Sequence, residues 1–213
     1  MFPTVEVRWF QQGQADSALR AWFRHVAHQA QEQTPRVDYY LRASNPDNLG
    51  IKLREGLVEI KEHHQTYGQV SFHQHVHGHV DGWRKWSFPQ PETMPRVDSE
   101  TFHQAWIGVK KERWLCLFRI RSETLEAVPL STQPKAGCGL ELTQVEASGE
   151  TWWSVGLEAF GKEEENFERL LKVGKHIFAQ DPPSFERPYS RSYPQWLATL
   201  ERSSAAKRSP PSK

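Results

Sequence analysis

Apolar and polar residues alternate along several short segments of the chain, a pattern typical of strands that bury one face. The clearest case is segment 49–61, where Glu55-Gly56 separates two alternating runs. An acidic residue followed by glycine is typical of a hairpin turn. The alternation therefore predicts two strands with an apolar face on one side. Lys52 and Arg54 share the opposite face of the first strand, and Glu59 and Lys61 that of the second.

The same alternation predicts strands at 4–10, 36–42, 83–88, 106–120, 139–145 and 151–160. Segment 106–120 fits either a hairpin or one long bent strand. Apolar residues at helical spacing predict helices at 16–33 and 162–179, and a short final helix beginning at Ser192. Thr34-Pro35 is expected to end the first helix, because proline cannot donate a backbone hydrogen bond. Asp81-Gly82 is expected to form a turn.

Segments rich in proline, glycine and serine predict loops at 45–48 and 89–99 and a break in the sheet between 121 and 138. No repeat or change of composition divides the chain before its end. We therefore expect residues 1–200 to form one domain. Residues 201–213 are small, polar and basic and include two prolines, so they predict a disordered polar tail.

Composition narrows the possible partners and compartment. The net charge is +1 and the mean hydropathy is −0.72 over 213 residues. The chain lacks the run of about 18 apolar residues that a membrane span needs, and its N-terminus lacks a secretory pattern. We therefore expect a cytoplasmic protein without a membrane partner. Cys116 and Cys138 are too few for a disulfide framework, so we expect buried thiols. Nucleic acid is not favoured as a partner, and the sequence gives no oligomeric state.

Four histidines alternate along one segment, at positions 73, 75, 77 and 79. On a strand their imidazoles would line one face as a chelating strip. Zinc sites usually draw ligands from more than one segment, and a single strand provides no tetrahedral cage. The favoured interpretation is therefore a solvated, loop-like polar stretch.

Charged residues share one face on most of the predicted strands. They are Glu6, Arg8, Lys52, Arg54, Glu59, Lys61, Lys85, Lys111, Arg113, Glu141 and Glu158. In an open antiparallel sheet this would be the solvent face, and on pattern alone that interpretation is favoured. In a barrel with its apolar face outside, the same charges would line the interior. Basic side chains there would bind phosphates, and carboxylates would hold a hard cation such as Mg²⁺.

Short motifs distinguish these alternatives. Thr4–Arg8 is similar to a Glu-x-Glu-x-Lys strand, and Asp38-Tyr39-Tyr40 to an Asp-x-Tyr-Tyr strand. The predicted hairpin is similar to a Leu-Arg-x-Arg strand followed by Leu-Thr-x-Lys. Lys111-Glu112-Arg113 resembles Lys-x-Arg, and 192–197 resembles Ser-Tyr-x-x-Leu-Leu. In this order and spacing, the motifs resemble the CYTH domain of the triphosphate tunnel metalloenzymes, which include thiamine triphosphatases and class IV adenylate cyclases.

The resemblance implies an α+β fold, mainly an antiparallel β-barrel around a tunnel, with flanking N- and C-terminal helices, over residues 1–200. It implies a small triphosphate or short polyphosphate as the ligand and Mg²⁺ or Mn²⁺ as the cofactor. Glu6, Glu141 and Glu158 would hold the metal, and Glu6 and Glu158 would be catalytic. The residues implied to bind phosphate are Arg8, Lys52, Arg54, Lys61, Lys85, Lys111 and Arg113.

The departures from the family pattern are concentrated among its acidic residues. Thr4, Thr143 and Gly156 stand where the family has carboxylates, and Arg8 stands where it has lysine. Arginine does not deprotonate, so it cannot act as a base. This bias favours anion binding over two-metal hydrolysis. Metal-dependent triphosphate hydrolysis and a non-catalytic polyanion-binding module therefore both stay open. A third interpretation is an open sheet that binds a partner through exposed tryptophans.

Overall fold

The computed structural model of the protein describes residues 1–42, 47–94, 97, 99–121 and 124–208, with side chains as far as Arg202. Its strands are β1 (Phe2–Gln12), β2 (Gln31–Leu41), β3 (Leu49–Arg54), β4 (Leu57–His73), β5 (Val76–Pro89), β6 (Trp106–Arg121), β7 (Thr124–Val128), β8 (Gly137–Ala147) and β9 (Glu150–Phe160). Its α-helices are α1 (Ser17–Val26), α2 (Glu100–Ala105), α3 (Glu163–Phe178) and α4 (Tyr193–Arg208). Two short 3₁₀ helices are η1 (Leu130–Thr132) and η2 (Arg187–Tyr189).

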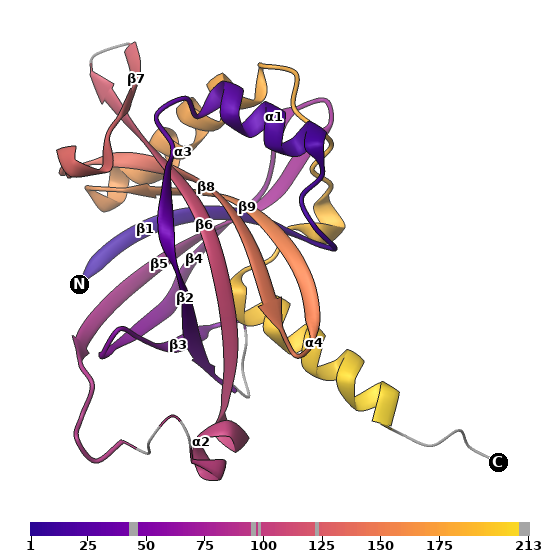
Figure 1. Ribbon diagram of the computed structural model, residues 1–213. Coiled ribbons are helices and arrows are strands. Elements are labelled where there is room, and N and C mark those ends of the chain that lie inside the picture. The colour runs from indigo at the N-terminus through magenta and orange to yellow at the C-terminus, as the bar shows by residue number, and fades with distance from the viewer. Residues whose placement is uncertain (43–46, 95–96, 98, 122–123, 209–213) are drawn as a thin grey trace.

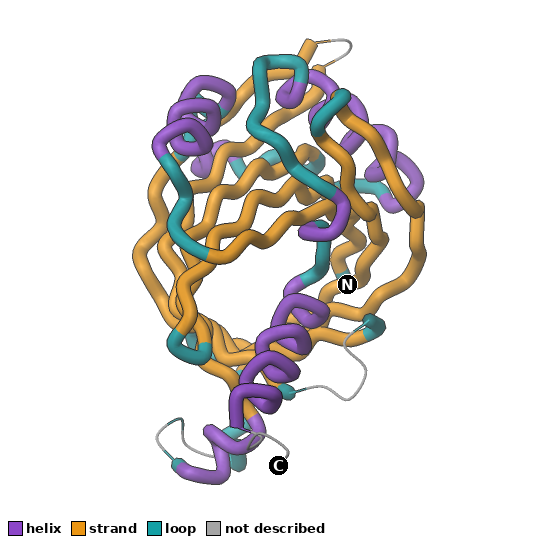
Figure 2. Tube along the Cα trace, turned by 90° about the vertical axis from the view of Figure 1, so that its right-hand side faces the viewer, coloured by secondary structure: helices purple, strands orange, loops and turns teal. Residues whose placement is uncertain are grey.

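Eight of the strands form a closed antiparallel barrel (Figures 1 and 2). Their order is β2-β3-β4-β5-β1-β9-β8-β6, and pairing between β2 and β6 closes the ring. β7 pairs with β6 beside the barrel. The prediction of an α+β fold that is mainly an antiparallel barrel with flanking helices is confirmed. The open-sheet interpretation is wrong, because β2 and β6 leave no free edge between them.

The barrel carries its apolar face outside, beneath helices. On β1, Val5, Val7 and Trp9 belong to the main hydrophobic core with residues of α1 and α3, such as Trp22 and Phe178. Because side chains alternate along a strand, the charged residues between them point into the barrel. A smaller apolar cluster under α2 covers the outside of β2, β3 and β6. Burial of the apolar face therefore places the charged face in the interior.

The start of α4 closes one end of the barrel. Trp196 is fully buried and stacks on Phe10, with ring centroids 4.7 Å apart and planes 3° apart. Leu197 and Leu200 join the same cluster with inward-facing apolar residues of β1, β2, β6 and β8. The barrel interior thus has an apolar end, filled by α4, and a charged remainder.

The segment before α4 is part of the barrel wall. β1 pairs with β5 through residues Phe2–Glu6, and beyond that point residues 185–190 lie between the two strands. Phe185 bridges to Val76, and Ser190 bridges to Trp9. This arrangement carries the chain from the barrel wall directly to the start of α4.

The predicted hairpin at 49–61 is confirmed. Glu55 and Gly56 have φ of 50° and 75°, the left-handed conformation of both residues in a type I′ turn, and Arg54 pairs with Leu57. The predicted strands at 139–145 and 151–160 are also confirmed, joined by a turn at Ser148-Gly149. Segment 106–120 forms one long strand, β6, rather than a hairpin.

The predicted helix at 16–33 is too long. α1 ends at Val26, and β2 already begins at Gln31. Pro35 does not end a helix but lies within β2, at a register shift between Gln33 and Arg36 where the ladder is interrupted. A bulge of this kind tolerates a residue without an N–H donor. The last apolar position of the predicted helix, Ala30, lies in the connection between α1 and β2, where it still packs against the main core.

The predicted turn at Asp81-Gly82 is wrong, because both residues lie within the continuous strand β5. The predicted break at 121–138 contains β7 and η1, and α2 was not predicted. His73 ends β4 and His75 lies in the turn before β5, so the four histidines do not share one strand. Parts of the predicted loops, residues 45–46, 95–96 and 98, lie outside the described residues.

At the C-terminus, α4 continues to Arg208, within the segment 201–213 predicted as a disordered tail. Residues 209–213 lie outside the described residues. None of the helices in the described part of the chain has the length and apolar character that crossing a membrane requires.

Candidate functional site

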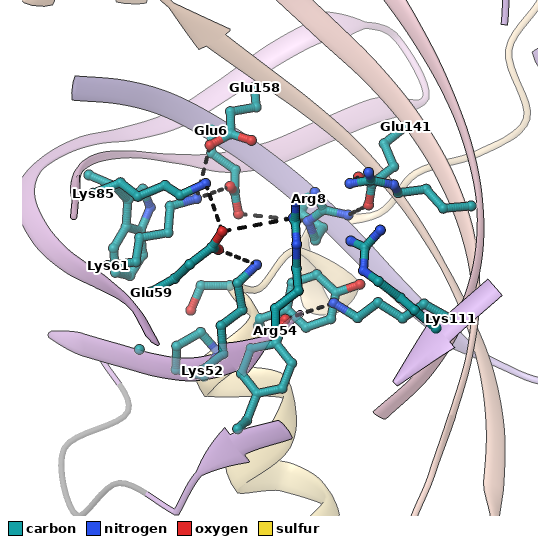
Figure 3. A pocket seen from close by; sticks show the side chains of 18 residues that line it. Glu6, Arg8, Lys52, Arg54, Glu59, Lys61, Lys85, Lys111, Glu141 and Glu158 are labelled. Carbon is teal, nitrogen blue, oxygen red and sulfur yellow. Dashed lines mark hydrogen bonds and ion pairs between the residues drawn. The ribbon is translucent and has the colours of Figure 1, made fainter. Parts of the chain in front are cut away.

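A cavity of about 140 Å³ lies in the charged part of the barrel interior (Figure 3). All ten residues that the sequence analysis assigned to binding, catalysis or metal line it, and their individual roles stay predictions. The remaining lining residues are Arg36, Tyr40, Gly50, Glu59, Trp83, Ser192, Tyr193 and Pro194.

Every strand of the barrel contributes a charged side chain to this cavity. The eight cationic side chains come from β1 to β6, and the four carboxylates come from β1, β4, β8 and β9. The lining thus has an excess of four positive charges. In a confined site of low dielectric constant, such an excess favours an anionic ligand.

Glu6 and Glu158 are directly opposite each other on β1 and β9. Two like charges in that position would repel, but the Lys61 ammonium lies between them. It donates a hydrogen bond to Glu6 and another, of 3.2 Å, to Glu158 Oε1. Burial by itself raises the pKa of Glu158, yet the charges of Lys61, Lys85 and Arg8 lower it to about 2. The Lys61 ammonium is therefore the shared counter-ion of two carboxylates.

Arg8 lies on the cavity wall opposite a strand position without a side chain. Its Nη1 donates to Glu141 Oε1 at 2.8 Å and to Ser154 Oγ at 3.2 Å, and its guanidinium lies 5.0 Å from the centre of the Tyr193 ring. Gly156 is its cross-strand partner, and a Cβ there would lie 2.6 Å from the Arg8 Cζ. Gly156, predicted as a lost carboxylate, therefore provides the space that the arginine occupies.

Glu141 is held by several donors at once. Besides Arg8, it accepts hydrogen bonds from Arg113 Nη1 at 3.1 Å and from Thr143 Oγ1 at 2.7 Å. Burial raises its pKa, but the charges of Arg8 and Arg113 outweigh this effect and hold the pKa far below its usual value. Thr143, another predicted loss of a carboxylate, thus orients Glu141 and adds no charge.

Asp38 is the fully buried counter-ion of three cations. Its carboxylate lies 2.8 Å from Arg36 Nε, 2.9 Å from Lys111 Nζ and 4.0 Å from Lys52 Nζ. Lys111 also donates to the Tyr40 hydroxyl at 2.7 Å. Burial lowers the pKa of Lys111 to about 8 against the opposing charge of Asp38. Burial, with the neighbouring charge of Lys111, also lowers the pKa of Lys52 to about 8.

Glu59 has a similar role on β4, two strands away. It lies 2.7 Å from Lys52, 3.5 Å from Lys85 and 3.9 Å from Arg54. Sequence reasoning placed it on the charged face but gave it no role in the site. It also assigned no role to Asp38 and Tyr193, although both lie in the motifs quoted above. Alternation was the only signal for Glu59, whereas for Asp38 and Tyr193 the signal was the motif.

Three buried donors in the lining make no hydrogen bond within the described part of the chain. They are Arg8 Nε, Arg113 Nε and the Tyr193 hydroxyl. An unmade hydrogen bond from a buried donor is costly. The cavity therefore retains donor capacity for an additional acceptor.

The same residues can be tested for their fit to Mg²⁺ or Mn²⁺. Across the described ranges, no three His, Cys, Asp or Glu side chains are grouped as the ligands of a metal ion. Glu6 and Glu158 are nevertheless two carboxylates that already share one cation position. Mg²⁺ is often bound by one or two carboxylates together with phosphate oxygens. The pair therefore fits a divalent cation that a phosphate ligand also contacts.

Comparisons with known proteins give no family for the chain. No family model matches it, and no curated protein matches it. Among solved structures, the PH1819 protein from Pyrococcus horikoshii OT3 aligns over 92% of this chain and 99% of that one. The TM-score is 0.47 and the sequence identity is 15%. Membership of the CYTH family stays a prediction.

Proposed function

We propose that the protein binds a small triphosphate or short polyphosphate inside the barrel and hydrolyses it with the help of Mg²⁺ or Mn²⁺, as the resemblance to CYTH proteins implies. The observation that carries this proposal is the convergence of eight cationic side chains from six strands on one cavity. With four carboxylates in the same lining, this set leaves an excess of positive charge that an anionic ligand would neutralise.

The cationic residues divide into fixed and adjustable groups. Arg8 and Arg113 are both held by Glu141, and Arg8 Nε also lies 3.7 Å from Glu6 Oε1. Guanidinium groups fixed in this way suit the recognition of phosphate oxygens. Lys61 and Lys85 lie partly exposed in the cavity and pair with carboxylates that a phosphate chain can replace. Positioning of the ligand by such groups contributes strongly to phosphoryl transfer, which depends mostly on orientation and electrostatics.

Hydrolysis needs an activated water molecule and a neutralised leaving group. A bound Mg²⁺ or Mn²⁺ would supply both by binding phosphate oxygens and polarising water. Glu6 and Glu158 would hold it. Among the chain's own residues, Arg8 cannot accept a proton, so it stabilises charge on the ligand and does not act as a base.

A non-catalytic phosphate-binding module is the second candidate. One observation favours it specifically. Glu141, the third predicted metal ligand, is occupied by Arg8, Arg113 and Thr143, so two carboxylates stay near the Lys61 position. A protein with this reduced acidic set could bind the ligand without hydrolysing it.

One experiment separates these functions. The protein is titrated by calorimetry with tripolyphosphate, ATP and thiamine triphosphate, each with EDTA or with excess Mg²⁺ or Mn²⁺, and phosphate release is then measured. Binding with metal-dependent release supports the hydrolase, and binding without release supports the module. No binding of any of the three compounds would exclude both.

Two variants link the result to the cavity. Glu158→Gln should abolish metal-dependent release, and unchanged release would remove Glu158 from the catalytic role. Lys52→Ala/Arg54→Ala should weaken binding in either function. The matched control is Lys110→Met, because Lys110 lies next to Lys111 on β6 but is half exposed and pairs with Glu146 at the surface.

A further inference from the structure

We infer that Lys61 couples the binding of the phosphate ligand to the binding of a divalent cation, so that each greatly strengthens the other. This inference rests on the proposed function and concerns the ligand-free state of the same cavity. In that state the Lys61 ammonium takes the place of a metal ion between Glu6 and Glu158, and it exchanges carboxylate partners for phosphate partners when ligand and cation bind together.

The geometry of the three side chains carries the inference. Glu6 and Glu158 are paired in register, and the single Lys61 ammonium contacts both. Glu6 is almost completely buried, whereas the Lys61 side chain is 27% exposed and lines the cavity. The ring of Trp83, 5.5 Å from Nζ, supports the lysine from one side. The Glu158 side chain, at 39%, is exposed as well, so the Lys61 ammonium and the Glu158 carboxylate are free to exchange partners, whereas Glu6 is held in place.

A divalent cation on its own meets an occupied site. It would have to displace the partly exposed Lys61 ammonium, which would then lose both carboxylate partners in a cavity lined by seven other cations. It would also gain only two carboxylates, because no third acidic or histidine ligand joins them in the part of the chain that the structure describes. We therefore expect weak binding of metal to the protein alone.

A phosphate chain on its own meets the converse problem. To bind it, Lys61 must leave Glu6 and Glu158. Glu6 would keep the longer ion pair with Arg8, at 3.7 Å, but Glu158 would lose its ion pair with Lys61, and the two facing carboxylates would repel each other and the ligand. When both ligands are present, the cation neutralises the carboxylates and the phosphate neutralises Lys61. No charge is then left unpaired, and the coupling is reciprocal by thermodynamic necessity.

Glu141 does not take part in this exchange. Its three donors, Arg8, Arg113 and Thr143, all hold it in place, and Lys61 is not among its contacts in the described residues. The inference therefore places the cation on Glu6 and Glu158 and gives Glu141 the role of positioning Arg8.

The test measures coupling by calorimetry and does not depend on turnover. The probe is tripolyphosphate with methylene groups in place of the bridging oxygens, which cannot be hydrolysed. Its Kd is measured with EDTA and with excess Mg²⁺ for the native protein, Lys61→Met, Glu158→Gln and the control Lys110→Met. Metal alone is followed by titrating each protein with Mn²⁺ and recording the spin resonance signal of free Mn²⁺.

For the native protein and Lys110→Met, we expect Mg²⁺ to lower the Kd by about 10-fold or more, within the usual range of coupling. For Lys61→Met and Glu158→Gln, the ratio should fall towards 1. Lys61→Met should also bind Mn²⁺ alone more tightly than the native protein. Chelation of Mg²⁺ by the free probe is the same in all four titrations, so differences between the ratios come from the protein.

The failure of the inference and that of the proposed function give different results. A native ratio near 1, or an unchanged ratio in both Lys61→Met and Glu158→Gln, would overturn the coupling and leave phosphate binding intact. If the native protein binds the probe neither with EDTA nor with Mg²⁺, the proposed function itself is wrong.

Discussion

Arg8 and Gly156 show how one substitution in a motif is accommodated by another. The guanidinium is larger than the ammonium that the CYTH pattern has at this position, and it lies directly against the β9 backbone at Gly156. The structural role of Gly156 therefore follows from its missing Cβ and not from the loss of a charge. Replacing Gly156 with alanine adds a single methyl group and tests this role.

Gly156→Ala should destabilise the protein by about 1–3 kcal/mol, the usual cost of overpacking a filled interior. The added Cβ would lie 2.6 Å from Arg8 Cζ and would push the guanidinium away from Glu141 and Ser154. Phosphate binding should weaken as well. Denaturant unfolding and calorimetry measure the two effects.

The control for this prediction is Gly108→Ala on β6. There the nearest atom, on Tyr39, lies 3.4 Å from the added Cβ, an ordinary contact distance. Alanine should be neutral or slightly stabilising at that exposed strand position. Equal stability of the two variants would show that Arg8 moves freely and does not depend on Gly156.

Lys52 and Lys111 make ligand binding sensitive to alkaline pH. Both amines have a pKa of about 8 because of burial, so they lose their charge as the pH rises through 8. The Kd of tripolyphosphate measured with EDTA should therefore increase between pH 7 and 9. In Lys52→Arg the charge at position 52 is permanent, so the increase should be smaller.

The same pKa values affect stability with the opposite sign. The folded pKa of each lysine lies below the usual 10.5, so the unfolded chain binds more protons between pH 8 and 10.5. These two groups therefore make the free energy of unfolding rise with pH in that window. If ligand binding and stability both fell between pH 8 and 9, the two lysines would not be the groups that titrate.

Residue types on the charged face could be predicted from alternation alone, and all ten assigned residues line the cavity. The counter-ions were harder to predict. Asp38 matters because it forms an ion pair with Lys111 of β6, and Glu59 because it forms one with Lys85 of β5. These are cross-strand contacts whose register is not encoded locally. The missed residues are thus mostly those whose role depends on a neighbouring strand.

At the scale of elements, α4 links stability to the ligand site. Trp196 is fully buried against Phe10, and the residues just before it, Ser192–Pro194, line the cavity. Trp196→Ala should lower the free energy of unfolding by about 3–5 kcal/mol. It should also weaken phosphate binding, since Tyr193 packs against both Trp196 and the Arg8 guanidinium.

Phe88→Ala is the control for this prediction. Phe88 is 43% exposed at the end of β5, so truncation should cost much less. Denaturant unfolding gives the stability of both variants, and calorimetry at a temperature where both are folded gives the affinity. Native affinity in Trp196→Ala would mean that α4 closes the barrel without shaping the site.

Elements set by local signals were predicted well, and those set by distant partners were not. The Glu55-Gly56 turn needs two left-handed residues and specifies its own hairpin. The end of α1 has no comparable signal. Residues Gln31–Gln33 form a strand because they pair with β6, more than 75 positions away, and this pairing overrides the apolar spacing of the segment. β7 likewise forms by pairing with its neighbour β6.

At the scale of the whole molecule, the pairing of β2 with β6 determines whether the charged face lies in water or inside the barrel. The same alternation of residues suits an open sheet with its charges in water and a barrel with its charges inside. Contact between β2 and β6 closes the ring, and α1 and α3 cover the apolar exterior. The sequence favoured the open sheet on pattern alone, because closure depends on segments far apart. The CYTH-like motifs supplied the information that alternation lacked.

Because the barrel is closed, we expect the lysines that point into it, and not basic residues on its outer surface, to bind the ligand. A ligand at 100 times its Kd should stabilise the native protein by about 2.7 kcal/mol, visible as a rise in the midpoint of thermal unfolding. The rise should be much smaller in Lys85→Met, whose ammonium lies in the cavity 3.5 Å from Glu59. It should be unchanged in Lys110→Met, whose side chain points away from the barrel interior.

Salt dependence provides an independent check of this prediction. Raising the ionic strength from about 0.1 M to about 1 M shortens the screening length from about 10 Å to about 3 Å. Ion pairs inside the barrel are screened less than exposed ones, so the thermal shift should decrease with salt without disappearing. A shift that disappears at high salt, or that Lys110→Met reduces as much as Lys85→Met, would instead show that the phosphate binds on the outer surface. The charged side chains of the cavity would then form a structural network of ion pairs. In that network Asp38, Glu59 and Glu141 would keep their lysine and arginine partners, and no ligand would replace them.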